Sequence, residues 1–151
     1  MTVAVNPPSQ SNILFGVPEG QDAFVLRERA IESQRNDGGV ALHIAADDAR
    51  AQTVMDLMAF FAPDIEIVHF PAWDCLPYDR VSPTTQIVGQ RMKALMTLKS
   101  RAASDIRKPM LVLTTVQAMT RKIIHPDNLS HIGGFMVRAG ERLGVEAFQN
   151  F

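Results

Sequence analysis

MLVLTT, residues 110–115, is the stretch that decides the fold. It is a continuous apolar run of strand length, and it leads directly into VQAMTRKII, residues 116–124, which predicts a helix that ends before Pro126. Two similar apolar runs precede it, VALHIAA at 40–46 and IEIVHF at 65–70. An uninterrupted apolar strand is typical of a parallel sheet that is buried on both faces. The three runs therefore predict the strands of one parallel sheet.

Helical segments separate these strands. Residues 22–37 are rich in helix formers and end at Gly38-Gly39, and the segment that Asp47-Asp48 can cap is amphipathic until Pro63. A third helix opens at Thr84 or Thr85. Strands that alternate with helices predict parallel pairing with helices on both faces, which is the α/β class. The apolar stripes of the second and third helices are Val54, Leu57, Met58 and Phe61, and Val88, Met92 and Leu95.

The composition is that of a globular chain. Hydrophobic residues make up 46% and charged residues 21% of the 151 residues, which excludes a disordered or fibrous segment. No apolar run approaches the roughly 18 residues of a membrane span. The amino-terminal residues lack the pattern of a secretory signal, so we expect a cytoplasmic protein without membrane contact. The single cysteine excludes an intramolecular disulfide and a metal site built from several cysteines.

The net charge of −1 conceals an uneven distribution. Residues 1–90 carry 5 Lys/Arg and 12 Asp/Glu, a net of −7, whereas residues 91–122 carry 8 Lys/Arg and 1 Asp, a net of +7. This basic stretch suits a phosphate backbone or an acidic protein surface, and a solvated helix face is the plainer interpretation. We expect that reversing four of its charges weakens a contact without unfolding the chain. These candidate contact residues are Lys99, Arg101, Arg107 and Lys108.

A phosphate-binding loop is the first site to look for in a parallel α/β protein, because backbone amides and a helix N-terminus can cradle phosphates there. The candidate stretch is ILFGVPEGQDA, residues 13–23, in which a strand end is followed by Gly16, Gly20 and the first helix. Aligned on Gly16, it lacks the second glycine, the lysine and the hydroxyl residue of G-x-x-x-x-G-K-[ST]. Their places are taken by Gln21, Asp22 and Ala23.

The exchange of a lysine for Asp22 reverses the electrostatics of this loop. At about 4 Å and an effective dielectric near 20, a pair of unit charges is worth roughly 4 kcal/mol, so Asp22 repels the polyphosphate that a lysine would attract. Ala23 also lacks the hydroxyl that would bind Mg²⁺. We therefore predict a loop with the shape of a phosphate loop that binds no nucleotide. A plain turn before a helix with an acidic first residue is the alternative.

No arrangement of catalytic residues is apparent in the sequence. Cys75 has acidic neighbours and no histidine at a readable spacing, so we expect an incidental thiol. His43 and His69 lie on predicted strands and are expected to pack in the core. Zinc-protease, paired-carboxylate and Ser-His patterns are absent. The chain is therefore predicted to have no catalytic residue, no metal and no cofactor of its own.

PAWDCLPYDRVSP, residues 71–83, contains three prolines and is a long loop. Trp73, Leu76, Pro77 and Tyr78 give it an apolar, aromatic character. It either folds back over the edge of the sheet as a plug or forms a contact surface. Its candidate contact residues are Trp73, Leu76 and Tyr78.

The same loop carries a family resemblance. FPAWDCLPYDRVSP at 70–83, a helix with Gln90-Arg91-Met92 and Leu95, and MLVLTTVQAMTRKIIHP at 110–126 together resemble the N-terminal region of bacterial transcription-repair coupling factors (Mfd). The likeness covers about residues 12–151, and its W-x-x-L-P-Y-D core is specific. The region is also similar to the first domain of the excision-repair subunit UvrB. There an intact phosphate loop stands in the place of LFGVPEGQDAF, residues 14–24.

The resemblance implies a RecA-like α/β fold with a degenerate phosphate loop and no ATPase activity. In the family, ATP, Mg²⁺ and DNA translocation belong to a separate motor, and RNA polymerase and DNA are partners of other domains. The N-terminal module recruits UvrA and docks on a C-terminal domain of its own chain, which keeps the free protein inhibited. The family's UvrA-binding arginines have no matching position here. The short link between the second strand and the third helix argues against the damage-probing hairpin of UvrB.

These observations predict three segments: a loose lead-in at 1–11, a RecA-like domain at 12–126, and the truncated start of a small α+β UvrA-binding domain at 127–151. The function that follows is a non-catalytic, UvrB-like module of a coupling factor in nucleotide excision repair. Two alternatives remain open at this point. One is an active P-loop nucleotide-binding or helicase domain, against which Asp22 and Ala23 argue. The other is a nonspecific nucleic-acid-binding module, which the acidic first 90 residues disfavour.

Overall fold

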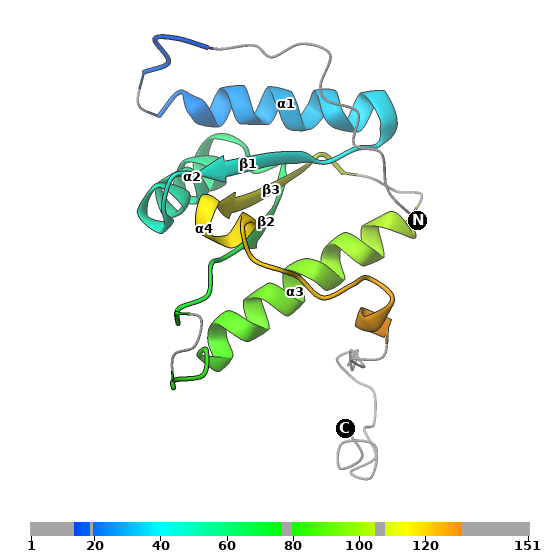
Figure 1. The fold of residues 1–151 in the computed structure, drawn as a ribbon. Helices are drawn as coiled ribbons and strands as arrows, with labels where there is room; N and C mark the ends of the chain where they lie inside the picture. Colours follow the sequence, from blue (N-terminus) through cyan, green and yellow to red (C-terminus); the bar gives the residue numbers. More distant parts are fainter. Residues whose placement is uncertain (1–13, 19, 77–79, 105–107, 131–151) are drawn as a thin grey trace, which may run out of the picture.

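A three-stranded parallel sheet with helices on both faces forms the centre of the structure (Figure 1). This computed structural model describes residues 14–18, 20–76, 80–104 and 108–130. The sheet order is β1-β3-β2, with β1 at Ala41–Ala45, β3 at Met110–Thr115 and β2 at Glu66–Phe70. The α/β class and the parallel sheet predicted from the sequence are confirmed, and the arrangement is compatible with a RecA-like fold.

The register of the sheet brings two histidines into one row. Leu113 in β3 pairs with His43 on one side and with His69 on the other. Every residue of β3 is buried, as expected for the central strand, whereas β1 and β2 lie at the edges among the described residues. The two histidines therefore flank Leu113 on one face of the sheet.

Two helices pack on that face. They are α1 (Asp22–Asp37) and α2 (Asp48–Phe61), and both contact β1 and β3. Figure 1 shows α1 running along one side of the sheet, opposite α3. The core between these helices and the sheet is apolar and contains small residues where the helices approach closely. Its buried members are Ala23, Ala30, Ala45, Ala51, Val54, Met58, Ala62, Ile65, Leu111 and Leu113.

The opposite face is covered by α3 (Thr85–Ala102), which contacts β2, and by the short α4 (Val116–Met119). The predicted stripe of α3 enters the core only in part, because Leu95 packs against the core whereas Val88 lies at the surface. Its buried residues are Arg91, Ala94 and Arg101, while Val88 is 38% exposed. The two buried arginines donate hydrogen bonds to the backbone carbonyls of Pro71 and Lys108.

Local signals fix where the elements begin and end. The Asp47 side chain accepts a hydrogen bond from the Arg50 N–H at 2.7 Å and caps α2, as predicted. Gly38 ends α1 in the left-handed conformation with φ of 62°, which a residue without Cβ adopts easily. Thr84 precedes α3, as predicted, and its hydroxyl donates to the Asp74 carboxylate at 2.6 Å. The long loop is therefore fastened to the start of α3.

Two expectations about apolar segments are wrong. The run at 40–46 is not buried on both faces, because Leu42 is 51% and Ile44 is 45% exposed. Their strand is an edge strand, and α3 contacts β2 on that side of the sheet. The helix expected over 116–124 ends at Met119, and Ile123 and Ile124 beyond it are partly exposed. A 3₁₀ turn at Asn128–Ser130 follows.

Several expectations fall on residues outside the described part of the chain. These are the lead-in at 1–11, Ile13, Tyr78, Arg107 and the predicted second domain beyond residue 130. The three-segment division of the chain stays a prediction. Among the described helices, none is long and apolar enough to cross a membrane.

Candidate functional site

The stretch that the sequence predicts to be a degenerate phosphate loop lies before α1. Gly16 and Gly20 both have positive φ, 70° and 91°, so both positions use the freedom of a residue without Cβ. The Gln21 N–H donates to the Pro18 carbonyl at 3.0 Å, which closes a tight turn onto the helix. Residues 14–18 form no strand, and Leu14 and Phe15 are exposed. The expected strand end is therefore missing from the described residues, whereas the glycine turn is present.

At the position where the motif alignment would place a lysine, Asp22 forms an ion pair. One Asp22 carboxylate oxygen, Oδ2, lies 2.5 Å from the Arg50 guanidinium in the first part of α2. The Asp22 side chain is 18% exposed and that of Arg50 is 38% exposed. The other oxygen of Asp22 is buried and makes no hydrogen bond with the described residues. The start of α1 therefore carries its own anion, which competes with any phosphate for the positive end of the helix.

Three residues near this ion pair, Ala23, Thr114 and Thr115, have structural roles. Ala23, at the place of the Mg²⁺-binding hydroxyl, is fully buried in the core between α1 and the sheet. At the carboxyl end of β3, Thr114 donates to the Phe70 carbonyl at 2.8 Å, and Thr115 caps α4. Neither residue offers a carboxylate to a metal ion. Among the described residues, no three His, Cys, Asp or Glu side chains come together as a metal site.

His43 and His69 are half-buried beside this region. Burial lowers the pKa of His43, an effect that the Asp22 carboxylate opposes and the Arg50 guanidinium reinforces. Burial also lowers the pKa of His69, opposed by Asp48. His69 Nε2 is buried and makes no hydrogen bond with the described residues. Burial thus favours the neutral form of both histidines.

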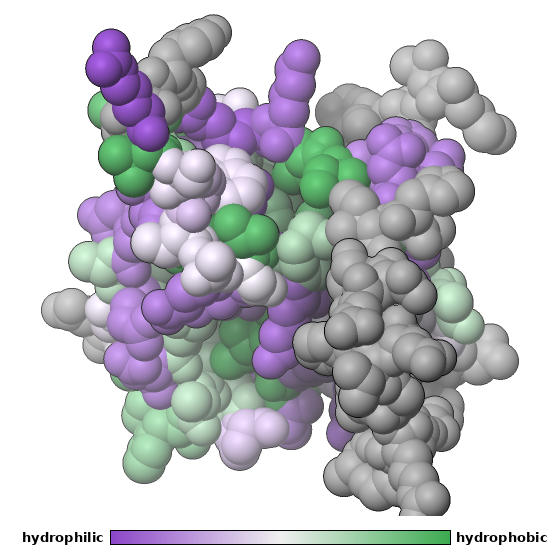
Figure 2. Space-filling view, turned by 90° about the horizontal axis from the view of Figure 1, so that it is seen from below, coloured by the Kyte–Doolittle hydropathy of each residue, from purple (hydrophilic) through white to green (hydrophobic). Residues whose placement is uncertain are grey.

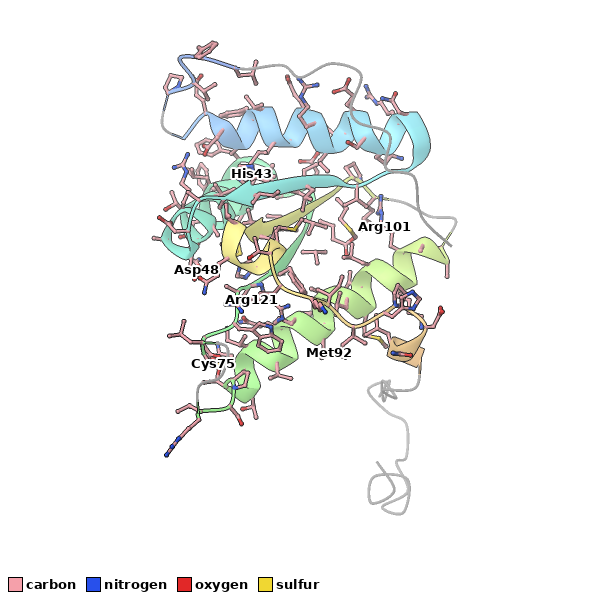
Figure 3. The ribbon with its side chains drawn as sticks, in the orientation of Figure 1. His43, Asp48, Cys75, Met92, Arg101 and Arg121 are labelled. Atoms are coloured by element: carbon pink, nitrogen blue, oxygen red, sulfur yellow. The ribbon has the colours of Figure 1, made fainter. Side chains whose placement is uncertain are left out.

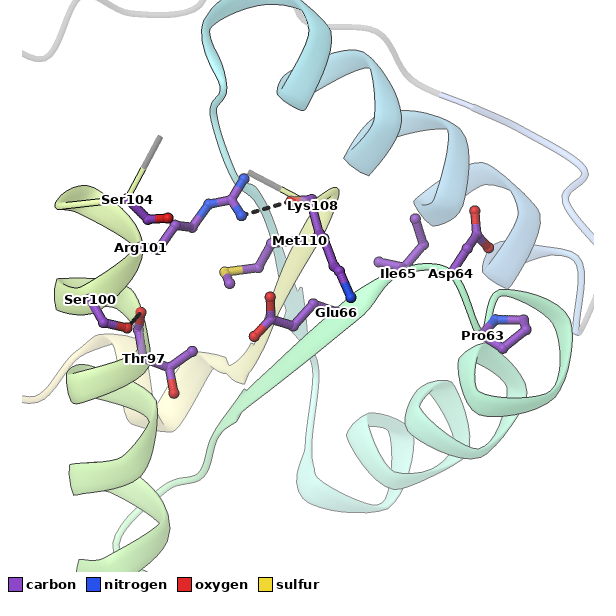
Figure 4. Close-up of a pocket in the computed structure, with 10 residues that line it drawn as sticks. All are labelled: Pro63, Asp64, Ile65, Glu66, Thr97, Ser100, Arg101, Ser104, Lys108 and Met110. Atoms are coloured by element: carbon purple, nitrogen blue, oxygen red, sulfur yellow. Dashed lines mark hydrogen bonds between the residues drawn. The ribbon is translucent and has the colours of Figure 1, made fainter. Parts of the chain in front are cut away.

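A cavity lies at the opposite end of the sheet, where the strands begin. Its volume is about 700 Å³, and it sits where β2 and β3 begin, beside the end of α3 (Figure 4). Ligands of open parallel sheets bind at the carboxyl ends of the strands. Its lining mixes Glu66 and Asp64 with Lys108 and Arg101, and Asp64 is bound to Arg27 at 2.7 Å. The cavity therefore lies away from the strand ends where ligands usually bind, and its lining carries charges of both signs.

Trp73 is held in a stack. The Arg91 guanidinium lies 4.0 Å from the ring centre of Phe70 and 4.2 Å from that of Trp73, and it donates to the Pro71 carbonyl at 2.5 Å. Leu76, three residues further on, is 68% exposed. The start of the loop thus packs on the sheet, while Leu76 points into solvent. Figure 3 shows Cys75 in this loop, close to the start of α3 and far from His43.

The basic stretch does not form one free surface. Arg101 is buried and donates to the carbonyls of Lys108 at 2.7 Å and Gly39 at 3.1 Å (Figures 3 and 4). Arg101 is therefore not an exposed contact residue, and we expect reversal of its charge to destabilise the fold, because these carbonyls would lose their donor. Lys99 donates to the Pro126 carbonyl at 3.4 Å, and Lys108 is exposed.

Sequence reasoning missed the two arginines that organise these regions. Arg50 pairs with a residue 28 positions away, and Arg91 bonds to a carbonyl 20 positions away. One signal for Arg91 was available: it sits among the apolar residues of α3, on the helix that follows an aromatic loop. No local sequence pattern predicts the ion pair of Arg50, because the packing of α1 on α2 brings it next to Asp22.

The chain is similar to two curated transcription-repair-coupling factors. It is 24% identical to that of Haemophilus influenzae over 139 residues, which cover 92% of this chain and 11% of that protein. It is 24% identical to that of Rickettsia bellii over 89 residues, which cover 59% and 8%. The resemblance inferred from the aromatic loop and the third strand is confirmed. The chain spans about a tenth of the length of these relatives.

No protein-family model matches the chain, and no solved structure matches it significantly.

Proposed function

We propose that this chain is a nucleotide-free, RecA-like module of a transcription-repair coupling factor. The observation that carries the proposal is the ion pair between Asp22 and Arg50 at the place where a phosphate loop needs a lysine. The module does no chemistry. It serves as a rigid support within a longer protein whose motor lies elsewhere in the chain.

Electrostatics supports the absence of nucleotide binding. A phosphate at the start of α1 would approach the Asp22 carboxylate, and at about 4 Å such a like-charge contact costs roughly 4 kcal/mol at an effective dielectric near 20. Arg50 cannot take over the role of the lysine while it is bound to Asp22. Releasing it would leave a partly buried carboxylate without its partner.

The similarity to coupling factors supports the biological role. Both relatives carry that name, and the chain matches only 11% and 8% of their lengths. We assign to this module the part that the UvrB-like region plays in the family: it supports recruitment of UvrA and docks on the C-terminal domain of its own chain. Other domains of the parent protein then bind RNA polymerase, DNA, ATP and Mg²⁺.

The test has two readouts on the intact parent protein. Asp22→Lys should leave the ATPase rate of the parent unchanged, because the hydrolytic site lies in the motor. Deletion of residues 1–130 should weaken UvrA binding by at least about tenfold, measured by surface plasmon resonance. The proposal is contradicted if Asp22→Lys changes the ATPase rate of the parent, or if the deletion variant binds UvrA as tightly as the parent does.

A matched control protects the first readout. Lys93→Asp changes the charge by the same amount on the exposed part of α3 and should also leave the ATPase rate unchanged. Thermal unfolding of each variant shows whether the module is still folded. A loss of ATPase rate in Asp22→Lys alone, with the fold intact, would count directly against a nucleotide-free loop.

A further inference from the structure

A small apolar groove lies between α3 and the segment that follows α4. Its cavity has a volume of about 120 Å³, which is room for one large apolar side chain. Figure 3 shows Met92 on α3 and Arg121 on the neighbouring segment, at the two sides of this region. The apolar lining consists of Trp73, Val88, Met92, Leu95, Ile123 and Ile124.

The rim of this groove is exposed apolar surface. Ile123 is 57% exposed, and Val88 and Ile124 are each 38% exposed. Figure 2, seen from the side of α3, shows hydrophobic patches next to hydrophilic side chains on this face. Apolar side chains that surround a cavity and remain in contact with water mark a site for a partner.

The charge around the groove has one sign. The charged side chains in the lining of the cavity are Arg91 and Lys122, and Arg121 precedes Lys122 in the chain. Both charged residues of the lining are cations and none of its residues is a carboxylate, which favours an acidic partner.

Arg91 gives a second, independent indication. It lines the cavity, is 3% exposed, and lies between the rings of Phe70 and Trp73. No ion pair joins it to a carboxylate among the described residues, and burial lowers its pKa without an opposing acidic neighbour. Buried cations are normally paired with an anion. The floor of the groove is thus a buried positive charge that has no anionic partner within residues 14–18, 20–76, 80–104 and 108–130.

We propose that this groove docks an acidic amphipathic polypeptide segment of a partner protein. One large apolar side chain of that segment enters the cavity between Val88 and Ile123, and its carboxylates face Lys122 and Arg121. A nucleic acid fits less well, because the cavity itself is lined mainly by apolar side chains. This docking does not depend on the state of the phosphate loop, so it stands or falls separately from the proposed function.

The experiment is selection from a random dodecapeptide library displayed on phage, with the whole chain as the target. The enriched peptides should be acidic and carry Leu, Phe or Trp. Synthetic copies should bind more weakly as salt rises, because the cationic rim is exposed. Enrichment of basic or neutral peptides, or no enrichment, overturns the proposal.

Paired variants locate the site. Val88→Glu should weaken binding of the selected peptide by at least about tenfold, because it places a carboxylate on the rim. Phe60→Glu, the same kind of change at a side chain that is 78% exposed on α2, should leave it within about twofold. Lys122→Glu should weaken it several-fold, whereas Lys93→Glu on the same helix as Val88 should change it little. Equal effects of groove and control variants overturn the proposal.

Two further outcomes assign the groove to a different occupant. Sedimentation of the chain alone would show a dimer that Val88→Glu dissociates, if the groove bound a second copy. Single-stranded DNA would displace the selected peptide at low salt, if the groove bound nucleic acid. Either result overturns the assignment to an acidic polypeptide, and circular dichroism of every variant confirms that the fold is retained.

Discussion

The start of α1 and the groove beside α3 each place an arginine in a partly closed environment, but they treat its charge differently. Arg50 faces the Asp22 carboxylate at 2.5 Å, so the pair is neutral as a whole. Arg91 has two aromatic rings and one carbonyl and no carboxylate among the described residues. The charge of Arg50 is neutralised by Asp22, which fits our proposal that the start of α1 binds no phosphate. The charge of Arg91 is not neutralised by any described residue, which fits our proposal that the groove binds an acidic partner.

Substitution of Arg91 is expected to have the largest effect on the free energy of unfolding. Arg91→Ala removes the stack with Phe70 and Trp73 and the bond to the Pro71 carbonyl, and it leaves a void beneath α3. We expect it to lower the free energy of unfolding by about 3 kcal/mol, measured by urea denaturation. Arg91→Met keeps most of the volume and removes an unpaired buried charge, so its cost should be about 1 kcal/mol. Equal costs would contradict the view of Arg91 as an uncompensated cation.

Substitution of Arg101 is expected to have the next largest effect on the free energy of unfolding. Arg101→Glu removes the donor of the Lys108 and Gly39 carbonyls and places a buried carboxylate beside them. The free energy of unfolding should fall by about 2–3 kcal/mol. Lys108→Glu, an equal change of charge at an exposed side chain, should cost less than about 0.5 kcal/mol. Equal stability of the two variants would show that Arg101 belongs to the surface after all.

The ion pair at the start of α1 should contribute less. Asp22→Ala and Arg50→Ala should each lower the free energy of unfolding by about 1 kcal/mol, because the pair is only partly shielded from water. The double-mutant cycle should give a coupling energy of about 0.5–1 kcal/mol. A coupling energy near zero would mean that Arg50 does not neutralise Asp22 in solution.

The smallest effect is a dependence of stability on pH from His43 and His69. Burial lowers both pKa values in the folded chain below the usual value of about 6.5, so the unfolded chain binds more protons as the pH falls. Their contribution to stability is fully present above about pH 6.5 and is lost as the pH falls below it. Urea midpoints at several pH values should show this slope, and His43→Gln with His69→Gln should flatten it. An unchanged slope in the double variant would exclude these histidines as its source.

Much of the fold was predictable because its signals are local. Apolar runs gave the three strands, the Asp47 cap and Gly38 gave the ends of helices, and the order of strands and helices gave the parallel sheet. The exposed Leu42 and Ile44 were not predictable, because exposure depends on which strand lies at the edge of the sheet. The early end of the helix after Thr115 was also missed, since Ile123 and Ile124 pack beside α3 in an irregular segment.

The candidate site was predictable in part. The sequence alone shows that Asp22 and Ala23 stand where the motif of a phosphate loop has a lysine and a hydroxyl residue. It does not show that Arg50 reaches Asp22 from another helix, or that Ala23 is sealed in the core. Those facts arise from the packing of α1 on α2 and from positions far apart along the chain. A charge count likewise could not separate the buried Arg91 and Arg101 from the exposed lysines of the basic stretch.

The most direct measurement of the central claim is the response of the Gly16, Gly20 and Ala23 backbone amides to Mg²⁺ and ATP in ¹H–¹⁵N spectra. A loop whose phosphate position is filled by Asp22 and Arg50 should leave these three resonances in place up to about 1 mM nucleotide. Saturable shifts of these amides in the unaltered chain at micromolar ATP would contradict a nucleotide-free loop.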